Sequence, residues 1–213
     1  MKILFLGDSI TAGAGLAFPE DSFPSLVGKK LNCEIINYGV GGTRIARQRI
    51  PSENADFDED FLKRVEKMDK QADKVFVFGG TNDFGHGDAP IGNVSDGTPY
   101  TFCGAVNCLI DRLSETYEKG DICFILPLHR KDEQNKRGEN GCKTTDAGTL
   151  HDYVFAEESV LKKRKIKYLD LRESIPVNEL QNLTIDGLHP TEKGHQRLAE
   201  AIVQYMYGRL SRN

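Results

Sequence analysis

The apolar residues of the chain gather in five short runs, each about as long as a buried strand. The runs are rich in Ile, Val, Leu and Phe, as expected for strands that are covered on both faces. We therefore predict a strand at each run, over residues 2–6, 34–37, 74–78, 122–126 and 166–171.

Segments with a helical period lie between these runs. In the first of them, Phe23, Val27 and Leu31 are spaced to share one face of a helix, and Pro24 fits the first helical position after Ser22. Similar stripes of apolar side chains predict helices over residues 57–68, 102–113, 150–161 and 198–206.

The alternation of strands and helices predicts an α/β protein whose parallel sheet lies between two layers of helices. Five such units in 213 residues favour a three-layer α/β/α sandwich with a flavodoxin-like, five-stranded parallel sheet over an eight-stranded barrel. Because the chain shows no internal repeat and no linker composition, we expect residues 1–213 to form a single domain.

Composition changes this picture little, but it excludes some partners. The apolar fraction of 38% and the charged fraction of 28% are those of a soluble globular protein. The net charge is -4 and no large block carries one sign, which argues against a nucleic-acid partner. The basic run at residues 162–165 is expected to end a helix, where cations suit the helix dipole.

The cellular compartment is suggested by the apolar runs and the cysteines of the chain. No stretch approaches the roughly 20 apolar residues of a membrane span, and the first apolar run is too short for the core of a signal peptide. The five cysteines are an odd number without C-x-x-C spacing, which favours a reducing compartment. We therefore expect a cytoplasmic protein without a membrane span, and the sequence leaves its oligomeric state open.

Two connections are long, polar and rich in glycine, at residues 84–98 and 129–148. Loops of this length are usually functional lids or disordered segments.

Polar side chains and glycines follow the predicted strands. In a parallel sheet the carboxyl ends of all strands lie on one rim, and ligands bind there. Ser9 follows the first strand, Gly42 lies in the glycine-rich turn after the second, and Asn82 follows the third. Asp186 and His189 share one turn between the fifth strand and the last helix. The sequence thus predicts that these residues meet.

This set suits acyl transfer from an ester. A serine hydroxyl becomes a nucleophile when a histidine takes its proton, and a carboxylate fixes the tautomer of that histidine. We predict Ser9 as nucleophile, His189 as base and Asp186 as acid. The backbone N–H groups of Ser9 and Gly42 and the Asn82 amide are the expected donors to the oxyanion, each worth about 3 kcal/mol when preorganised.

Four separated segments together resemble the sequence blocks of the SGNH hydrolases, also called GDSL esterases/lipases. They are FLGDSITAG at residues 5–13, NYGVGGTRI at 37–45, GGTNDF at 79–84 and DGLHPTEKGH at 186–195. The resemblance implies the same nucleophile, acid and base, with Asn82 in the oxyanion hole. It places the oxyanion glycine at Gly42 rather than at Gly39 or Gly41.

The resemblance also implies metal-independent hydrolysis through an acyl-enzyme, with no cofactor. It leaves the substrate open, because the family covers lysophospholipids, thioesters, aryl esters and acetylated sugars. The polar long connections favour small-molecule or carbohydrate esters of short acyl groups, especially acetyl, whereas a lipase would be expected to show apolar stretches near its mouth. A lysophospholipase or acyl-thioesterase is the alternative.

Further residues that leave the carboxyl ends of strands are candidates for the substrate pocket. A solvated loop position is the alternative for the two histidines among them, and a metal site that includes Asp88 is not expected, because nothing fixes the spacing. The candidates are Thr43, Arg44, Phe84, His86 and His129.

Structural roles are the alternatives for single residues. Ser9 alone would suit a helix cap, and Asn82 alone would suit a turn. We expect Asp8 to hold the turn before Ser9 rather than to act as the acid, because sequence neighbours on a sharp turn point apart. Asp83 is expected to be structural as well.

Two functions of other classes are less favoured. A non-catalytic binding module would lack one of the chemical positions, and none is missing. A phospho-acceptor domain would need paired acids after the first strand and a lysine after the fifth, and the chain lacks this set.

Overall fold

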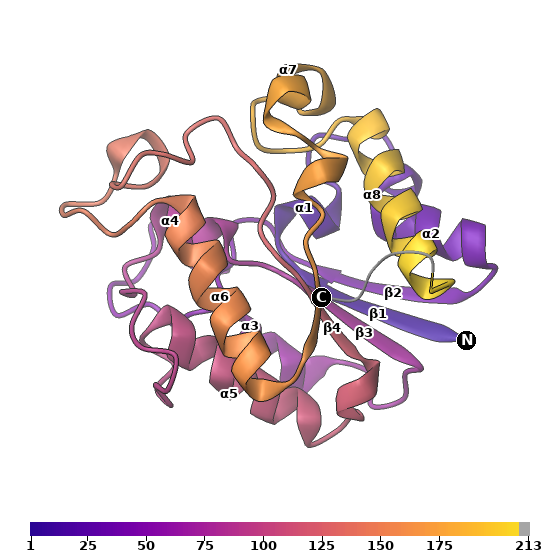
Figure 1. The fold of residues 1–213 in the computed structure, drawn as a ribbon, viewed down its shortest axis with the longest axis horizontal. Helices are drawn as coiled ribbons and strands as arrows, with labels where there is room; N and C mark the ends of the chain where they lie inside the picture. Colours follow the sequence, from indigo (N-terminus) through magenta and orange to yellow (C-terminus); the bar gives the residue numbers. More distant parts are fainter. Residues whose placement is uncertain (209–213) are drawn as a thin grey trace.

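The computed structural model describes residues 1–208 and has a single sheet between two layers of helices (Figure 1). Residues 209–213 of the predicted domain lie outside the described residues. All strands pair in parallel in the order β2-β1-β3-β4-β5, which confirms the predicted three-layer sandwich. The strands are β1 (Lys2–Gly7), β2 (Glu34–Gly39), β3 (Lys74–Phe78), β4 (Ile122–Ile125) and β5 (Lys167–Leu169).

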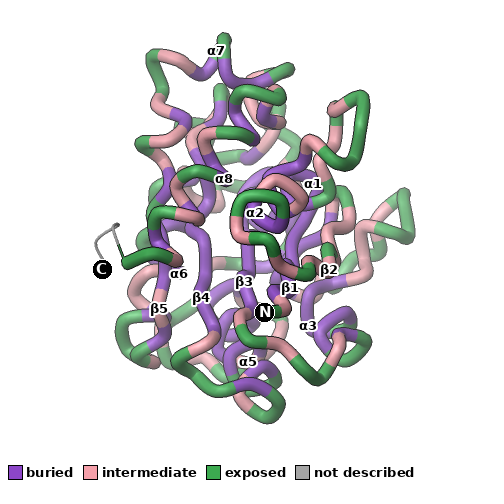
Figure 2. Tube along the Cα trace, turned by 90° about the vertical axis from the view of Figure 1, so that its right-hand side faces the viewer, coloured by how far each residue is buried: buried purple, intermediate pink, exposed green. Residues whose placement is uncertain are grey.

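The strands lie side by side, and β1, β3, β4 and β5 form the buried centre of the molecule, whereas the edge strand β2 is only partly buried (Figure 2). Side chains alternate between the two faces of the sheet, so that Ile3 and Phe5 of β1 pack on one face and Leu4 and Leu6 on the other. Each face is covered by helices, which explains why the strands read as continuous apolar runs.

The two helical layers differ in which cluster of core residues they cover. One layer holds α1 (Ser9–Ala12), α2 (Phe23–Leu31), α7 (Leu180–Leu183) and α8 (Glu192–Met206). The other holds α3 (Phe61–Arg64), α4 (Thr81–His86), α5 (Phe102–Ser114) and α6 (Leu150–Arg164).

Most predicted helices are present, with local differences. Pro24 is the second residue of α2, one position later than expected. The stripe over residues 57–68 is not one helix, because the Asp60 carboxylate accepts the Lys63 N–H at 2.9 Å and begins α3 anew. The basic run at residues 162–165 does lie at the end of α6, as predicted.

Among the described residues, no helix combines the length and the apolar character that crossing a membrane requires.

One buried charge-bearing group in this fold has no evident structural partner. Glu157 of α6 is fully buried, and neither carboxylate oxygen accepts or donates a hydrogen bond within residues 1–208. Burial, with the nearby Asp83 carboxylate, raises the pKa of Glu157 well above its usual value of 4.5. Burial therefore favours the neutral form of this side chain in the folded protein.

A Glu157→Gln variant is expected to be more stable than the parent at neutral pH. The pKa of Glu157 is higher in the folded protein than in the unfolded chain. As the pH rises from about 4.5 toward the folded pKa, the parent therefore loses up to about 1.4 kcal/mol of its free energy of unfolding per pH unit. Glutamine has the same shape and does not ionise. Thermal unfolding at a series of pH values should show a Tm gain that grows from pH 5 upward.

The neighbouring residue, Glu158, gives a control because its pKa is shifted in the opposite direction. Glu158 bonds to Tyr168 and Lys162; burial tends to raise the pKa of Glu158, but these contacts give a net lowering. Glu158→Gln should therefore lose stability relative to the parent as the pH rises through the titration of that carboxylate. Equal Tm differences for Glu157→Gln at every pH would contradict a buried neutral Glu157.

Candidate active site

The turn after β1 presents Ser9 at the start of α1. Asp8 caps this helix, since its Oδ1 accepts the Ile10 N–H at 2.9 Å. At Gly7 an added Cβ would lie 1.9 Å from the Thr11 Oγ1 atom, so the turn needs glycine there. Asp8 holds the turn, as predicted, and burial raises its pKa to about 6.

His189 lies between Ser9 and Asp186. Its Nε2 atom is 3.0 Å from the Ser9 Oγ, and its Nδ1 atom is 2.8 Å from the Asp186 Oδ2. Ser9 and His189 are 180 positions apart in the sequence, and the fold brings them together at the carboxyl ends of the strands. The arrangement allows a proton to pass from the hydroxyl to the imidazole while the carboxylate holds the ring.

The loop that carries Asp186 and His189 is closed on itself. The Ile185 N–H donates to the His189 carbonyl at 2.8 Å, and Gly187 takes a φ of +87 that favours glycine. Burial tends to raise the pKa of Asp186, but N–H groups of His189 and Leu188 donate to Oδ1 and the His189 ring bonds Oδ2, which lowers it to about 2. The carboxylate therefore stays ionised at neutral pH.

Three residues with available N–H donors, Ser9, Gly42 and Asn82, come from separate elements and line one cavity. The N–H of Ser9 lies at the start of α1, where helical N–H groups have no acceptor within the helix. Within residues 1–208 the N–H of Gly42 has no backbone or side-chain acceptor either. Asn82 donates one amide hydrogen to the Thr43 carbonyl at 2.9 Å, and its second amide hydrogen remains available.

The loop after β2 is held from beneath by Asp83. Its carboxylate accepts the N–H groups of Ile45 and Ala46 at 2.9 and 2.8 Å, a structural role that agrees with the prediction. Burial raises the pKa of Asp83 to about 6, against the lowering effect of these two bonds. Together with the Asn82 bond, these contacts fix the backbone on either side of Thr43.

Gly42 is shaped by what lies over it. Its φ of +72 is in the left-handed region, and an added Cβ would lie 2.2 Å from the ring of Phe57. Only glycine fits this position, which lies in the wall of the cavity that Ser9 also lines.

A cavity of about 720 Å³ opens above these groups. Ser9, Gly42, Asn82 and His189 line it, as does His86 of the predicted pocket residues. Its volume falls in the range of about 300–1,000 Å³ that is usual for small-molecule sites.

Three predicted pocket residues point into the protein instead of the cavity. Thr43 is 1% exposed, Arg44 is 3% exposed and Phe84 is fully buried. The Thr43 hydroxyl donates to the Val40 carbonyl at 2.7 Å, and Phe84 packs on the ring of Tyr153. These side chains support the cavity without lining it.

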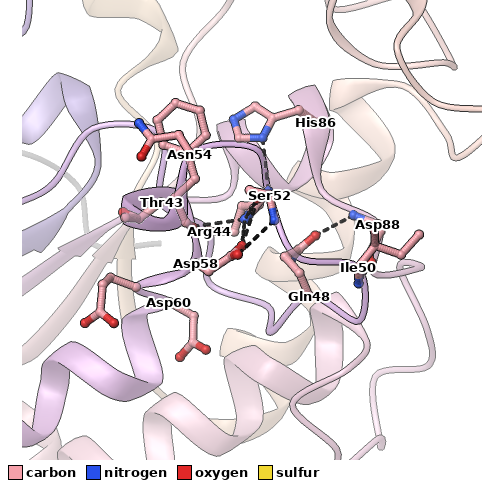
Figure 3. A network of polar contacts seen from close by, with 12 residues as sticks. Thr43, Arg44, Gln48, Ile50, Ser52, Asn54, Asp58, Asp60, His86 and Asp88 are labelled. Atoms are coloured by element: carbon pink, nitrogen blue, oxygen red, sulfur yellow. Dashed lines mark hydrogen bonds and ion pairs between the residues drawn. The ribbon is translucent and has the colours of Figure 1, made fainter.

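Arg44 organises the wall beside the cavity (Figure 3). Its Nη2 donates to Ser52 Oγ at 2.7 Å, to the Phe57 carbonyl at 3.0 Å and to Asp58 Oδ1 at 2.6 Å. Its Nη1 lies 3.2 Å from the Nδ1 atom of His86. The guanidinium thus ties the segment after β2 to the end of α4.

His129 is also outside the cavity. Its Nδ1 pairs with Glu133 at 2.8 Å, and the residue is not among those that line the space around Ser9. Within residues 1–208, no three His, Cys, Asp or Glu side chains are grouped closely enough to hold a metal ion.

Sequence reasoning missed several residues of the cavity wall. Asn54, Asp56 and Phe57 come from the segment after β2, and Glu139 and Asn140 come from the long connection at residues 129–148. Phe57 was expected in a core helix, but it lies in a short 3-10 helix at Ala55–Asp58. The polar, proline-bearing stretch at residues 47–56 is a loop signal that would have separated Phe57 from the helix.

Comparison with solved structures finds the same fold. A protein from Lactobacillus plantarum has a TM-score of 0.81 and 24% identity, covering 99% of this chain and 98% of its own. A lipase/acylhydrolase from Enterococcus faecalis has a TM-score of 0.67 and 22% identity, covering 100% and 98%. A carbohydrate acetylesterase from Sinorhizobium meliloti has a TM-score of 0.71 and 15% identity, covering 98% and 99%.

Comparison of sequences gives the family. No curated protein matches the chain. The sequence model of the GDSL-like lipase/acylhydrolase family matches residues 5–197, which include Ser9, Asn82 and His189. This chain therefore belongs to the GDSL-like lipase/acylhydrolase family.

Proposed function

We propose that the protein is a serine esterase that hydrolyses carboxylic esters through an acyl-enzyme formed on Ser9, within a single domain. The observation that carries this proposal is the pair of hydrogen bonds from Asp186 through His189 to the Ser9 hydroxyl, at 2.8 and 3.0 Å. Membership of a hydrolase family supports the reaction class.

The reaction begins when His189 Nε2 accepts the proton of the Ser9 hydroxyl as Oγ attacks the ester carbonyl carbon. Asp186 stabilises the imidazolium that forms. The carbonyl oxygen becomes an oxyanion, which accepts hydrogen bonds from the N–H groups of Ser9 and Gly42 and from the Asn82 amide.

The tetrahedral intermediate collapses as the C–O bond to the alcohol breaks. His189 donates its Nε2 proton to the departing alkoxide, which leaves as an alcohol, and the acyl group remains on Ser9. A water molecule then attacks the acyl carbon while His189 takes its proton. The second collapse returns that proton to Ser9 Oγ and releases the carboxylic acid.

A short acyl group on a carbohydrate is the substrate that the cavity fits best. The cavity walls combine apolar side chains, Val40, Phe57 and Leu188, with polar ones, Asn54, Asp56, Glu139 and Asn140. A long acyl chain would take these polar groups out of water without replacing their hydrogen bonds. The fold is shared with a protein named as a carbohydrate acetylesterase, and this likeness agrees with the choice.

Trapping and a substrate panel test the proposal together. An aryl phosphonate should phosphonylate Ser9 and release the phenol, so intact-mass and peptide analysis should find one adduct on that residue. Among p-nitrophenyl esters from acetate to palmitate, kcat/KM should be highest for acetate, and acetylated glycosides should release acetate. An adduct elsewhere would contradict the nucleophile. Faster cleavage of palmitate or of a lysophospholipid would replace the acetyl ester by the alternative substrates.

A further inference from the structure

A second cavity adjoins the one above Ser9. Its volume is about 540 Å³, and it shares His86 and Cys142 with the first cavity, so the two spaces meet at these side chains. One side of it is formed by Asp88–Ile91 after α4, and the other by Lys143–Ala147. A substrate bound at Ser9 that extended past His86 would enter a second space of ligand size.

His86, which lines both cavities, keeps one unused hydrogen-bond donor. Arginine can only donate, so the Nδ1 atom of His86, 3.2 Å from Arg44 Nη1, must be the acceptor (Figure 3). The proton of the neutral ring is then on Nε2. Within residues 1–208 that N–H has no protein acceptor.

The surroundings keep His86 in this form. Burial and the positive charge of Arg44 lower its pKa to about 4, with Arg130 and Lys143 adding to the effect and Glu139 opposing it. Arg44 itself is fixed by Ser52 and Asp58. The imidazole is therefore neutral at physiological pH, with its orientation set by a rigid partner.

The second cavity combines an apolar side with hydroxyl groups. Ile50 is 72% exposed at its rim, yet its backbone N–H is held by Asp88 Oδ2 at 2.7 Å, so the side chain is presented in a fixed place. Ile91 adds to the apolar side, and Thr144 and Thr145 are exposed on the opposite side. A sugar ring has this division, with a carbon face and a hydroxyl edge.

An acyl chain fits the junction poorly. A chain that crossed from the first cavity to the second would bury the His86 Nε2–H without an acceptor, a loss of about tenfold or more in affinity. A sugar supplies hydroxyl, ring or glycosidic oxygens at that point. The His86 Nε2–H therefore favours the alcohol portion of the ester, rather than the acyl chain, between the two cavities.

We propose that the second cavity binds a second sugar ring of the substrate's alcohol portion, and that His86 donates an Nε2–H hydrogen bond to a sugar oxygen where the substrate passes between the cavities. This inference rests on the proposed esterase function. His86 is a specificity-determining residue in this scheme, and the transferred acyl group stays beside Ser9.

The test compares phenyl acetate, an acetylated methyl glycoside and an acetylated disaccharide in one series of variants. In the parent, kcat/KM should be highest for the disaccharide. In His86→Phe the kcat/KM for both sugars should fall about tenfold relative to phenyl acetate, and His86→Gln, which retains an N–H donor, should recover part of the loss. Ile50→Ser should lower the preference for the disaccharide over the methyl glycoside.

His129→Phe is the matched control, because this histidine lies outside both cavities and should leave all ratios unchanged. An equal fall for all three esters in His86→Phe would overturn the role of the donor. A disaccharide preference that is absent, or unaffected by Ile50→Ser, would overturn the second ring site. Failure of the esterase proposal would differ, since the parent would then not cleave phenyl acetate.

Discussion

A Ser9→Ala variant is expected to lose about ten-thousandfold to a millionfold in kcat while its fold is retained. Ser9 Oγ is the atom that would attack the ester carbonyl, and His189 Nε2 lies 3.0 Å away to accept its proton. Alanine removes the nucleophile but leaves Asp8 in place as the helix cap. Initial rates with phenyl acetate, corrected for uncatalysed hydrolysis, measure the loss, and phosphonate labelling should disappear with it.

Ser22→Ala makes the same change at the N-terminal cap of α2. Ser22 is 1% exposed, and its hydroxyl contacts only Ser25 among the described residues, at 3.0 Å. The activity of the Ser22→Ala variant should match that of the parent. If Ser9→Ala retained more than about a tenth of parental kcat, a loss far below that expected of a nucleophile, the acyl-enzyme mechanism would be wrong.

An Asp186→Asn variant is expected to lose about ten-thousandfold in kcat with little structural change. The asparagine Oδ1 can still accept the N–H groups of Leu188 and His189, which lie 3.0 and 2.8 Å from the present Oδ1. Its amide nitrogen would replace Oδ2 and donate to His189 Nδ1. That contact favours the tautomer with the proton on Nε2, which cannot accept the proton of Ser9.

Asp8→Asn provides the comparison that separates the two candidate acids. Asparagine keeps the oxygen that accepts the Ile10 N–H, so the cap of α1 is retained. Kinetics of both variants on phenyl acetate should show a far larger loss for Asp186→Asn than for Asp8→Asn. The reverse order would move the role of the acid to Asp8.

Strands β1, β3, β4 and β5 could be predicted because both faces of the sheet are buried along them. Continuous apolar runs then coincide with strands, and Lys74–Phe78 matches its prediction at both ends. The fifth run is longer than β5, which spans only Lys167–Leu169, because its one partner strand, β4, is itself short at Ile122–Ile125. The ends of β5 are set by its pairing with β4, and the residues of the fifth run alone do not show where that pairing stops.

The residues proposed for catalysis could be named from the sequence because four blocks share one rim of a parallel sheet. The structure brings Ser9, His189 and Asp186 within hydrogen-bond distance, and their catalytic roles stay predictions. The directions of Arg44 and Phe84 could not be predicted. Arg44 turns inward because its guanidinium donates hydrogen bonds to Ser52 and Asp58. Its position after a strand does not reveal these partners, which come later in the sequence.

The hydrogen bonds that anchor the loop after β2 at both ends have a consequence for how its substrate recognition can change. Asp83 fixes the loop as far as Ala46, and the Phe61 N–H returns the chain to the Arg44 carbonyl at 3.0 Å. The intervening residues 47–60 begin and end at anchored points, and they contribute Asn54, Asp56 and Phe57 to the cavity wall. Within this segment Phe57 covers Gly42, and Ser52 and Asp58 hold Arg44. Exchanges that keep these contacts can therefore alter what is recognised while the groups proposed for catalysis keep their geometry.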